Sequence, residues 1–133
     1  WKKYVEDIKL ELNYKGKLTL DRDRFERVFF NLIKNAGEAS GGKASVTITS
    51  SQEDDYIKFT VSDNGPGIPK RIQKTLFKLG ATYGKKEGTG LGLYIVKKTV
   101  ELYRGKITCR SYPGEGTTFT IKIPKRISNK KFI

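Results

Sequence analysis

The 133-residue sequence contains no histidine, no methionine and a single cysteine. Zinc sites, Ser-His-Asp triads and Cys-His pairs need histidine or several cysteines, so none of them can form within this chain. Any histidine chemistry in which the protein takes part must therefore use a residue on another domain. Because methionine is absent even at position 1, we expect the sequence to be a mature fragment or an excised domain of a longer protein.

Long apolar runs are also missing. No segment approaches the roughly 20 residues that span a bilayer, and the N-terminus lacks the basic-then-apolar layout of a signal peptide. The length predicts a single domain over residues 1–133. Residues 125–133 form a basic tail, and their composition is compatible with disorder. We expect a cytoplasmic location and leave open whether the parent protein is membrane-anchored.

The charge is strongly basic, with 27 lysines and arginines against 14 acidic residues and a net charge of +13. Such an excess suits nucleic acid or an acidic partner. The basic residues are nevertheless scattered through every segment, so we expect a solvated surface that favours ATP or an acidic protein, and no nucleic acid. The lone Cys109 lies in an alternating segment, which favours a buried strand thiol over a reactive cysteine.

Hydrophobic periodicity and turn residues predict an α/β (α+β) two-layer sandwich, in which a mixed, mostly antiparallel sheet carries about three helices on one face. The sequence contains no internal repeat and no linker. The predicted elements are strands at 5–12 and 17–20, a helix from Asp21 or Asp23 to the glycines at 41–42, strands at 43–50 and 56–62, a short helix after Pro69, a glycine-rich flap at 78–89, a helix at 90–103 with Leu93, Val96, Val100 and Leu102 as candidate inner residues, and strands at 106–112 and 117–123.

The first predicted helix carries a polar row beside its apolar stripe. Asn31 and Asn35 are four residues apart, so their side chains lie on one face, and Glu38 falls on the same row. Such a row would line a cleft at the edge of the core. Neutral amide oxygens suit Mg²⁺ that is shared with phosphates, because this ion keeps several waters and needs few protein ligands. The alternative is that both asparagines merely decorate a solvated helix.

Two glycine tracts, at 63–68 and 88–93, together describe one nucleotide pocket. Glycine allows a base or a phosphate to approach the main chain closely, and the second tract runs into a predicted helix, whose N-terminus favours anions. Asp63 would accept from the exocyclic amino group of adenine, where guanine has a carbonyl; the alternative is a simple turn aspartate. The predicted pocket contacts in the tracts are Gly65, Gly67, Ile68, Gly88, Thr89, Gly90, Leu91, Gly92 and Leu93.

Three residues of the flap are further candidates. Tyr83 would stack on the base, and Lys85 and Lys86 would reach the polyphosphate, unless these flap residues are simply solvated. The glycine pattern is not a Walker P-loop, which would need Gly-Lys-Ser or Gly-Lys-Thr.

The motifs in this order closely resemble the Bergerat ATP-binding fold, and within it the catalytic and ATP-binding domain of bacterial sensor histidine kinases. The resemblance covers the chain from the first helix to Pro124. The matching motifs are Asn31-Leu-Ile-Lys-Asn35-Ala36 for the Asn box, Asp63-Asn-Gly-Pro-Gly-Ile68 for the first glycine box, Phe77 for the phenylalanine box, Gly88-Thr-Gly-Leu-Gly-Leu93 for the second glycine box and Gly114-Glu-Gly-Thr-Thr-Phe119 for the last.

The resemblance implies a role for each matching position. It makes Asn35 the Mg²⁺ ligand, Asn31 a phosphate or water contact and Asp63 the adenine reader, with Asn31 and Asn35 as the catalytic residues. Thr117 would be a water-mediated partner of the aspartate, and residues 78–89 the ATP lid. Two departures stand out: Glu38 replaces a frequent lysine, which puts a phosphate contact from this position in doubt, and residues 103–105 read Tyr-Arg-Gly in place of His-Gly-Gly.

Position 31 separates a kinase from an ATPase within this superfamily. DNA gyrase, mismatch-repair ATPases and the ninety-kilodalton heat-shock chaperone carry a glutamate there as general base for water, and an amide cannot take that proton. The resemblance thus implies an ATP-dependent protein histidine kinase that transfers the γ-phosphoryl group of Mg·ATP to a histidine. The alternatives are an ATP-hydrolysing domain of the gyrase or chaperone type and, further off, a non-enzymatic basic interaction module.

The implied partners lie outside this chain. The acceptor histidine would be on a helical dimerisation domain of the same protein, and the phosphoryl group would pass on to an aspartate in the receiver domain of a response regulator. We expect the parent protein to be a homodimer and the isolated domain to be a monomer.

Overall fold

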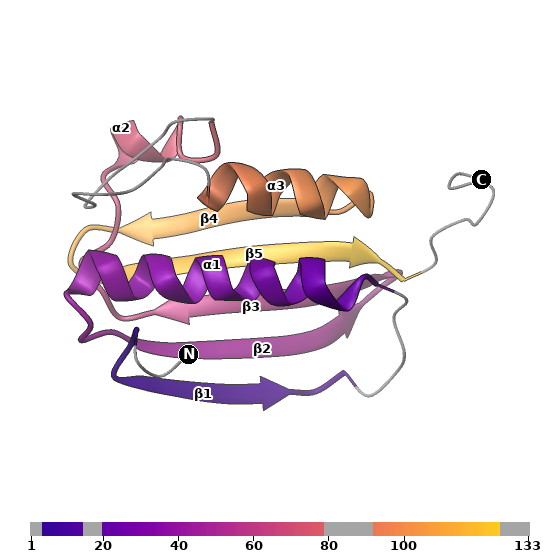
Figure 1. Ribbon diagram of the computed structural model, residues 1–133, viewed down its shortest axis with the longest axis horizontal. Coiled ribbons are helices and arrows are strands. Elements are labelled where there is room, and N and C mark those ends of the chain that lie inside the picture. The colour runs from indigo at the N-terminus through magenta and orange to yellow at the C-terminus, as the bar shows by residue number, and fades with distance from the viewer. Residues whose placement is uncertain (1–3, 15–19, 79–91, 126–133) are drawn as a thin grey trace.

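Five strands form one mixed sheet in the order β1-β2-β3-β5-β4 in a computed structural model that describes residues 4–14, 20–78 and 92–125 (Figure 1). Only β1 and β2 pair in parallel; the other neighbours are antiparallel. The elements are β1 (Asp7–Leu12), α1 (Arg22–Ser40), β2 (Ser45–Glu53), β3 (Tyr56–Asp63), α2 (Lys70–Gln73), α3 (Gly92–Leu102), β4 (Lys106–Tyr112) and β5 (Gly116–Pro124). This is the predicted sandwich with a mixed, mostly antiparallel sheet.

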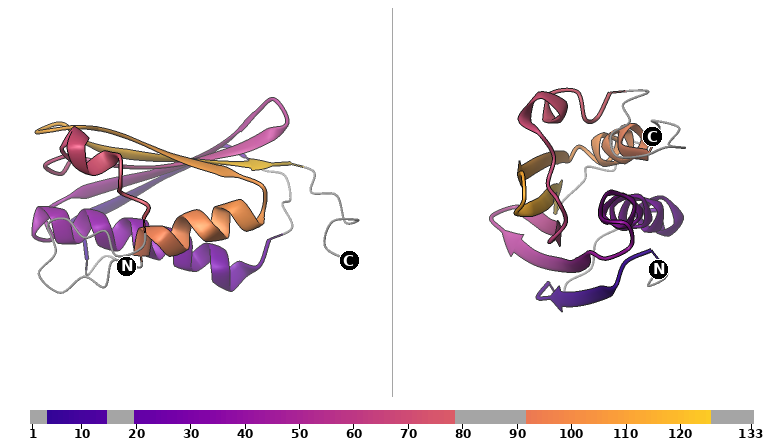
Figure 2. Two further views of the ribbon diagram at one scale, coloured as in Figure 1. Left: turned by 90° about the horizontal axis from the view of Figure 1, so that it is seen from above. Right: turned by 90° about the vertical axis from the view of Figure 1, so that its left-hand side faces the viewer.

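Helices α1 and α3 lie side by side on one face of the sheet, while the short α2 lies at the β4 edge (Figures 1 and 2). No described helix covers the opposite face, which is called the open face below. The core fills the space between this helical layer and the inner face of the sheet, because alternate strand residues point toward the helices. Its largest fully buried side chains are Leu32, Ile33, Ile57, Ile121, Ile123, Val28, Val46, Val96 and Val100.

Helix α1 begins and ends where its sequence predicts. Asp21 caps the N-terminus, since its Oδ1 accepts from the backbone N–H of Arg24 at 3.1 Å. At the other end Gly41 takes the left-handed conformation with φ of 66°, and the N–H of Gly42 bonds to the carbonyl of Gly37 at 2.7 Å. Capping signals at both ends therefore define a helix that is long enough to carry the whole polar row.

Three predictions about the elements are wrong in part. Polar residues 51–53 continue β2, so the turn is only Asp54-Asp55; the Glu53 carboxylate contacts Lys122 Nζ at 2.8 Å and Lys58 Nζ at 3.4 Å, which favours the longer strand. The helix predicted from Pro69 through Phe77 has only four residues and ends at Gln73. Leu102 is 45% exposed, because it lies about 200° around the helix from the buried Val100.

Some predictions fall on residues that the structure does not describe. They are the strand at 17–20 except its last residue, the flap at 78–89 except Lys78, the start of the helix at 90–91, and the tail except Lys125. Within the described ranges, no helix is long and apolar enough to cross a membrane.

The topology brings five chain segments to one end of the molecule. Strands β3 and β4 end there, β5 begins there, α1 ends there and α3 begins there, all at the left of Figure 1. The first glycine tract follows β3, so it leaves the sheet at this same end. Polar residues from distant parts of the sequence can therefore form one site here.

Candidate nucleotide-binding site

Three polar side chains form a row across the end of the sheet. Asp63 is the register partner of Thr117, and Thr117 is the partner of Ser111, so the row crosses β3, β5 and β4 on the inner face. Thr117 and Ser111 are only 5% and 4% exposed, and their hydroxyl oxygens are 2.8 Å apart. Because the positions two residues away belong to the apolar core, this row is the polar end of an otherwise hydrophobic face.

Asp63 is a half-buried acceptor held at a turn. Its Oδ1 accepts from the N–H of Gly65 at 2.8 Å, which closes the turn that follows β3. Burial raises the pKa of the Asp63 carboxyl, and hydrogen bonds from the backbone N–H groups of Gly65 and Thr117 oppose that rise. Two carboxylate oxygens have about four acceptor positions, so the group keeps capacity for a donor on a ligand.

The first glycine tract is packed against the turn between β4 and β5. Gly67 has φ of 79°, and a Cβ at this position would lie 2.3 Å from the carbonyl oxygen of Tyr112. Gly116 has φ of 98°, and its Cβ would lie 2.1 Å from the carbonyl oxygen of Asp63. A further backbone bond runs from Gly114 N to Pro66 O at 2.7 Å. Both glycines are thus required by close approach and by conformation.

Ser111 and Gln73 hold this tract in place, although no sequence motif marks them as site residues. The N–H of Ile68 donates to Ser111 Oγ at 2.7 Å. The Gln73 amide donates to the carbonyls of Ile68 at 2.7 Å and of Ser111 at 3.0 Å. Only Ser111 left a usable signal: in the alternating segment 106–112 it shares the inner face with Ile107 and Cys109.

Cys109 faces the same side of the sheet as Ser111. The thiol packs against the core from a strand, as predicted, but it is half-buried and not fully buried. Burial and, to a smaller extent, the negative charge of Asp63 raise the pKa of the Cys109 thiol to about 11. The thiol therefore stays protonated at neutral pH and is a packing group beside the site.

The polar row of α1 forms the second wall of the site. Asn31, Asn35 and Glu38 are all half-buried, and in the described part of the chain neither amide side chain makes a hydrogen bond to protein. A methyl group on Gly92 would lie 3.7 Å from Asn31 Oδ1, so the start of α3 faces Asn31. At the end of α1, Ser40 lies against Gly65, with 3.8 Å between the Ser40 Cβ and a Cβ placed there. Helix α1 thus extends from one glycine tract to the other.

The structure brings together part of the predicted site. Leu93 follows Gly92 in the first turn of α3 and packs half-buried against the core. The remaining flap and second-tract candidates lie outside the described residues and stay predictions; they are Tyr83, Lys85, Lys86, Gly88, Thr89, Gly90 and Leu91.

The sequence predicts that Asn35 binds magnesium. Among the described residues, no cluster of three or more His, Cys, Asp or Glu side chains could hold a metal without a ligand. The uncommitted amide of Asn35 fits an ion that takes most of its oxygens from phosphates and water. Its role as a metal ligand remains a prediction.

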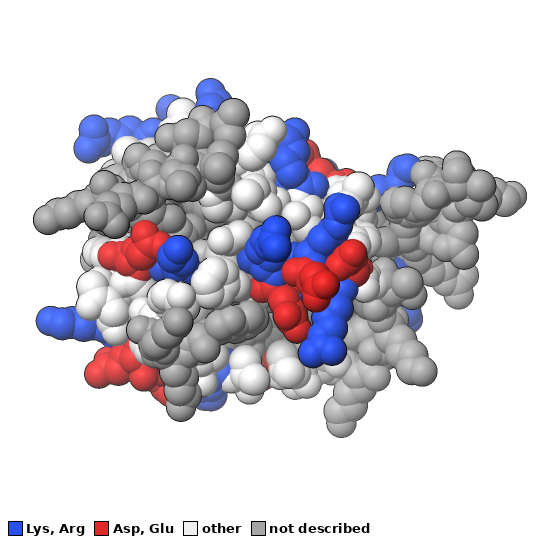
Figure 3. Space-filling model, viewed as in Figure 1, with Lys and Arg blue, Asp and Glu red and all other residues white. Residues whose placement is uncertain are grey.

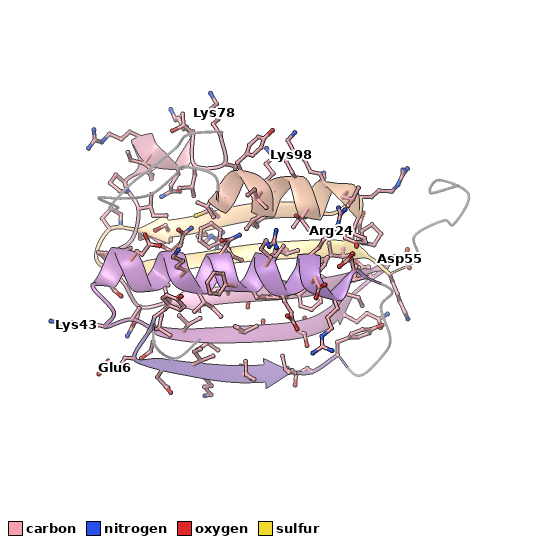
Figure 4. The ribbon with its side chains drawn as sticks, in the orientation of Figure 1. Glu6, Arg24, Lys43, Asp55, Lys78 and Lys98 are labelled. Atoms are coloured by element: carbon pink, nitrogen blue, oxygen red, sulfur yellow. The ribbon has the colours of Figure 1, made fainter. Side chains whose placement is uncertain are left out.

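Charges of both signs are interspersed over the helical face, mainly where α1 begins and α3 ends (Figure 3). A groove of about 390 Å³ lies between the first half of α1 and α3, and its lining includes Asp21, Arg24 and Thr99. Arg24 occupies this half of α1, whereas Lys43 follows the end of α1 near the site (Figure 4). The mixture of charges gives this groove no clear preference for an anion.

Comparison with known proteins agrees with this geometry. The model of the histidine kinase-, DNA gyrase B- and HSP90-like ATPase family matches residues 20–127. The alginate biosynthesis sensor protein KinB of Pseudomonas aeruginosa is 37% identical over 109 residues, which cover 81% of this chain and 18% of KinB. Sporulation kinase A of Bacillus subtilis is 37% identical over 108 residues, which cover 80% of this chain and 17% of that kinase.

A solved structure of the catalytic domain of histidine kinase ThkA, in a nucleotide-free form, superposes with a TM-score of 0.78 at 32% identity, over 93% of this chain and 82% of that one. The chain spans less than a fifth of the length of KinB and of sporulation kinase A. These matches confirm the resemblance inferred from the sequence motifs. The chain belongs to the histidine kinase-, DNA gyrase B- and HSP90-like ATPase family, and within it to the catalytic domains of sensor histidine kinases.

Proposed function

We propose that this domain binds ATP with Mg²⁺ and donates the γ-phosphoryl group to a histidine on a separate dimerisation domain of the same protein. The observation that carries the proposal is the placement of two kinds of polar group around one site. The acceptor row headed by Asp63 lies at the first glycine tract. The uncommitted amide of Asn31 lies beside the start of α3, and that of Asn35 is one turn farther along the same row of α1.

The base end of the site suits adenine. Asp63 is a half-buried acceptor next to backbone that only glycine allows to come so close. An exocyclic amino group donates to such a carboxylate, whereas a carbonyl in the same place would face it without a hydrogen. Thr117 is the cross-strand partner of Asp63 and supports the same contact through water.

The phosphate end uses α1 and α3. Asn35 would hold Mg²⁺, and Asn31 would contact a phosphate or a bound water. When bound, the ion neutralises negative charge that develops on the transferring phosphoryl group. Helix α3 adds the favourable end of its dipole, because it begins beside Asn31. The part of the protein in this site is therefore to position the nucleotide and stabilise charge.

The amide at position 31 favours a kinase over an ATPase. Asn31 cannot deprotonate water, so the site is better suited to transfer to a protein nucleophile. The chain has no histidine, so that nucleophile must come from another domain. Hydrolysis remains the second candidate, because Glu38 puts a half-buried carboxylate on the same row of α1. Transfer to a response regulator and a homodimeric parent protein follow from the kinase proposal.

Thermal denaturation with added nucleotides tests the binding half of the proposal. ATP and ADP with Mg²⁺ should raise Tm, because a ligand that binds only the folded state stabilises it, and GTP should raise it much less. Ser62→Ala is a matched control on the open face of the sheet and should behave like the wild type. If no adenine nucleotide changes Tm, the basic interaction module becomes the better explanation.

Radiolabelled ATP tests the transfer half. The isolated domain should neither label itself nor release phosphate at an appreciable rate, and label should appear when the histidine-bearing domain of the parent protein is added. Rapid phosphate release by the wild-type domain, abolished in Glu38→Gln or Asn31→Ala, would overturn the kinase assignment in favour of hydrolysis.

A further inference from the structure

We propose that Ser111 is a positioning residue that sets the base selectivity of the pocket by fixing the direction of the Thr117 hydroxyl. This inference rests on the proposed function, in which the base of a nucleotide lies at Asp63. Ser111 does not touch the nucleotide in this proposal and acts through its neighbours. The direction of the Thr117 hydroxyl follows from the number of protons and lone pairs in a buried cluster.

Ser111 is the centre of three short contacts. Its Oγ accepts from the N–H of Ile68 at 2.7 Å, lies 3.0 Å from the carbonyl oxygen of Gly116 and lies 2.8 Å from Thr117 Oγ1. The side chain is only 4% exposed, so water cannot replace these partners easily. Burial makes an unmade hydrogen bond costly in this cluster, and the arrangement that satisfies every contact is strongly favoured.

The count leaves one such arrangement. A serine hydroxyl has one proton and can accept two hydrogen bonds. A carbonyl oxygen can only accept, so Ser111 must donate its proton to Gly116. The contact with Thr117 then exists as a hydrogen bond only if the Thr117 hydroxyl donates to Ser111. In the opposite arrangement, the oxygens of Ser111 and Gly116 would face one another at 3.0 Å without a hydrogen.

With this proton direction, Thr117 and Asp63 both present only hydrogen-bond acceptors to the pocket. Once Thr117 has donated its only proton to Ser111, its hydroxyl can serve a ligand or a water molecule only as an acceptor. Asp63, its register partner, is an acceptor as well. Two adjacent acceptors favour a base that presents an amino group and disfavour one that presents a carbonyl. Selectivity for adenine over hypoxanthine is therefore expected to depend on Ser111.

Removal of the Ser111 hydroxyl should leave the surrounding backbone anchored. Gln73 still joins the carbonyls of Ile68 and of residue 111, and Gly114 still bonds to Pro66. What changes is the Thr117 proton, which is then free to turn toward the pocket and to donate to a carbonyl. The pocket loses its acceptor-only character without losing its shape.

A matched control lies on β3 and β5, and it shares β5 with the pair of Ser111 and Thr117. Ser62 and Thr118 form a second hydroxyl pair, 2.8 Å apart and half-buried, at neighbouring positions on the opposite face of the sheet. Ser62→Ala removes the same group from the same type of pair. It cannot influence the pocket through Thr117, whose side chain is on the other face.

The experiment is calorimetric titration of ATP and ITP, in the presence of Mg²⁺, into the wild type, Ser111→Ala, Thr117→Val, the double variant and Ser62→Ala. The triphosphate is identical in both ligands, so the ratio of their dissociation constants reports the base end alone. The wild type should prefer ATP by about ten- to a hundredfold, and Ser111→Ala should reduce this ratio about tenfold. The double variant should match Thr117→Val, because Ser111 acts through Thr117. Ser62→Ala should keep the wild-type ratio.

The outcomes separate this inference from the proposed function. If the wild type binds neither nucleotide, the proposed function fails and this inference fails with it. If the wild type prefers ATP but Ser111→Ala keeps the full ratio, or weakens ATP and ITP by the same factor, Ser111 is only structural and the inference is overturned. Should Ser111→Ala prove unfolded by its melting curve, Ser111→Cys keeps a side chain at this position, and because its sulfur is only a weak acceptor for the Thr117 proton, this variant should also lose selectivity.

Discussion

Two hydroxyl pairs lie back to back on β3, β4 and β5, and their surroundings differ completely. Ser111 and Thr117 face the helices and are almost fully buried, whereas Ser62 and Thr118 face solvent on the open side and are half-buried. The separation between the oxygens is 2.8 Å in both pairs. The same residue types at the same distance thus serve a pocket on one face and a solvated surface on the other. The difference comes from the backbone that each pair contacts.

The open face of the sheet is a polar surface with compensated charges. Thr60 lies between Thr49 and Thr120 in the register, with a short hydrogen bond to Thr49. Farther along the same strands, Lys58 and Lys122 are direct neighbours, and like charges in such positions disfavour a sheet unless they are compensated. Glu53 contacts both lysines, and these contacts lower the pKa of its carboxyl, chiefly through Lys122.

The largest expected effect comes from a methyl group on the pocket side. Gly67→Ala should lower the free energy of unfolding by more than about 3 kcal/mol and abolish nucleotide binding, because the new Cβ meets a backbone carbonyl and the left-handed conformation adds strain. The distance to the Tyr112 oxygen would be 2.3 Å, and backbone cannot move aside cheaply. Urea denaturation and calorimetric titration with ATP measure the two effects.

Gly114→Ala is the matched control for this substitution. Gly114 has a similar φ, 82° against 79° at Gly67, but nothing lies within 4 Å of its Cβ position. Only the conformational cost of about 1 kcal/mol remains, and nucleotide affinity should stay close to that of the wild type. Equal losses in the two variants would contradict the packing of the first glycine tract against β4.

Asp63→Asn should separate function from stability. The amide keeps an oxygen for the N–H of Gly65 but presents an NH₂ group where adenine needs an acceptor, so affinity for ATP should fall about ten- to a hundredfold. The free energy of unfolding should rise at neutral pH, since the substitution removes a carboxylate that burial disfavours.

The pH dependence of stability tests this expected gain in the free energy of unfolding. Burial raises the native pKa of Asp63 above its unfolded value of about 3.9, so the native state binds this proton more readily than the unfolded state. The contribution of Asp63 to stability is therefore full below the unfolded pKa and is lost as pH rises through the native pKa. Denaturant titrations between acidic and neutral pH should show Asp63→Asn gaining on the wild type across this window. A variant that is less stable at neutral pH would mean that the hydrogen bonds to Asp63 outweigh its burial.

Features that depend on local sequence signals could be predicted. Helix α1 was predicted correctly at both ends because its signals are local: Asp21 caps it, Gly41 ends it and the apolar period lies between them. The polar row of Asn31 and Asn35 followed from the same period. Local signals likewise placed Asp63 at the end of a strand.

The roles of Ser111 and Gln73 could not be predicted, because they depend on distant pairing. Ser111 meets Thr117 only through the register of β4 with β5. Gln73 reaches β4 and the first glycine tract only after α2 has packed at the sheet edge. Gly105 shows the same limit. The left-handed residue that ends α3 is Arg104, with φ of 61°, whereas Gly105 is needed because a Cβ there would lie 2.5 Å from the Lys122 carbonyl oxygen.

The smallest expected effect tests the open face directly. Thr118→Val keeps a β-branched side chain that suits a strand, and it leaves the Ser62 hydroxyl within reach of solvent. The free energy of unfolding should therefore change by no more than about 0.5 kcal/mol, with no change in affinity for ATP. Thr117→Val, one residue earlier, deprives the buried Ser111 of a partner and should cost about 1 to 3 kcal/mol. If the two valine variants were equally mild, the hydroxyl of Thr117 would be as dispensable as that of Thr118, and the buried row would lose its claim to organise the pocket.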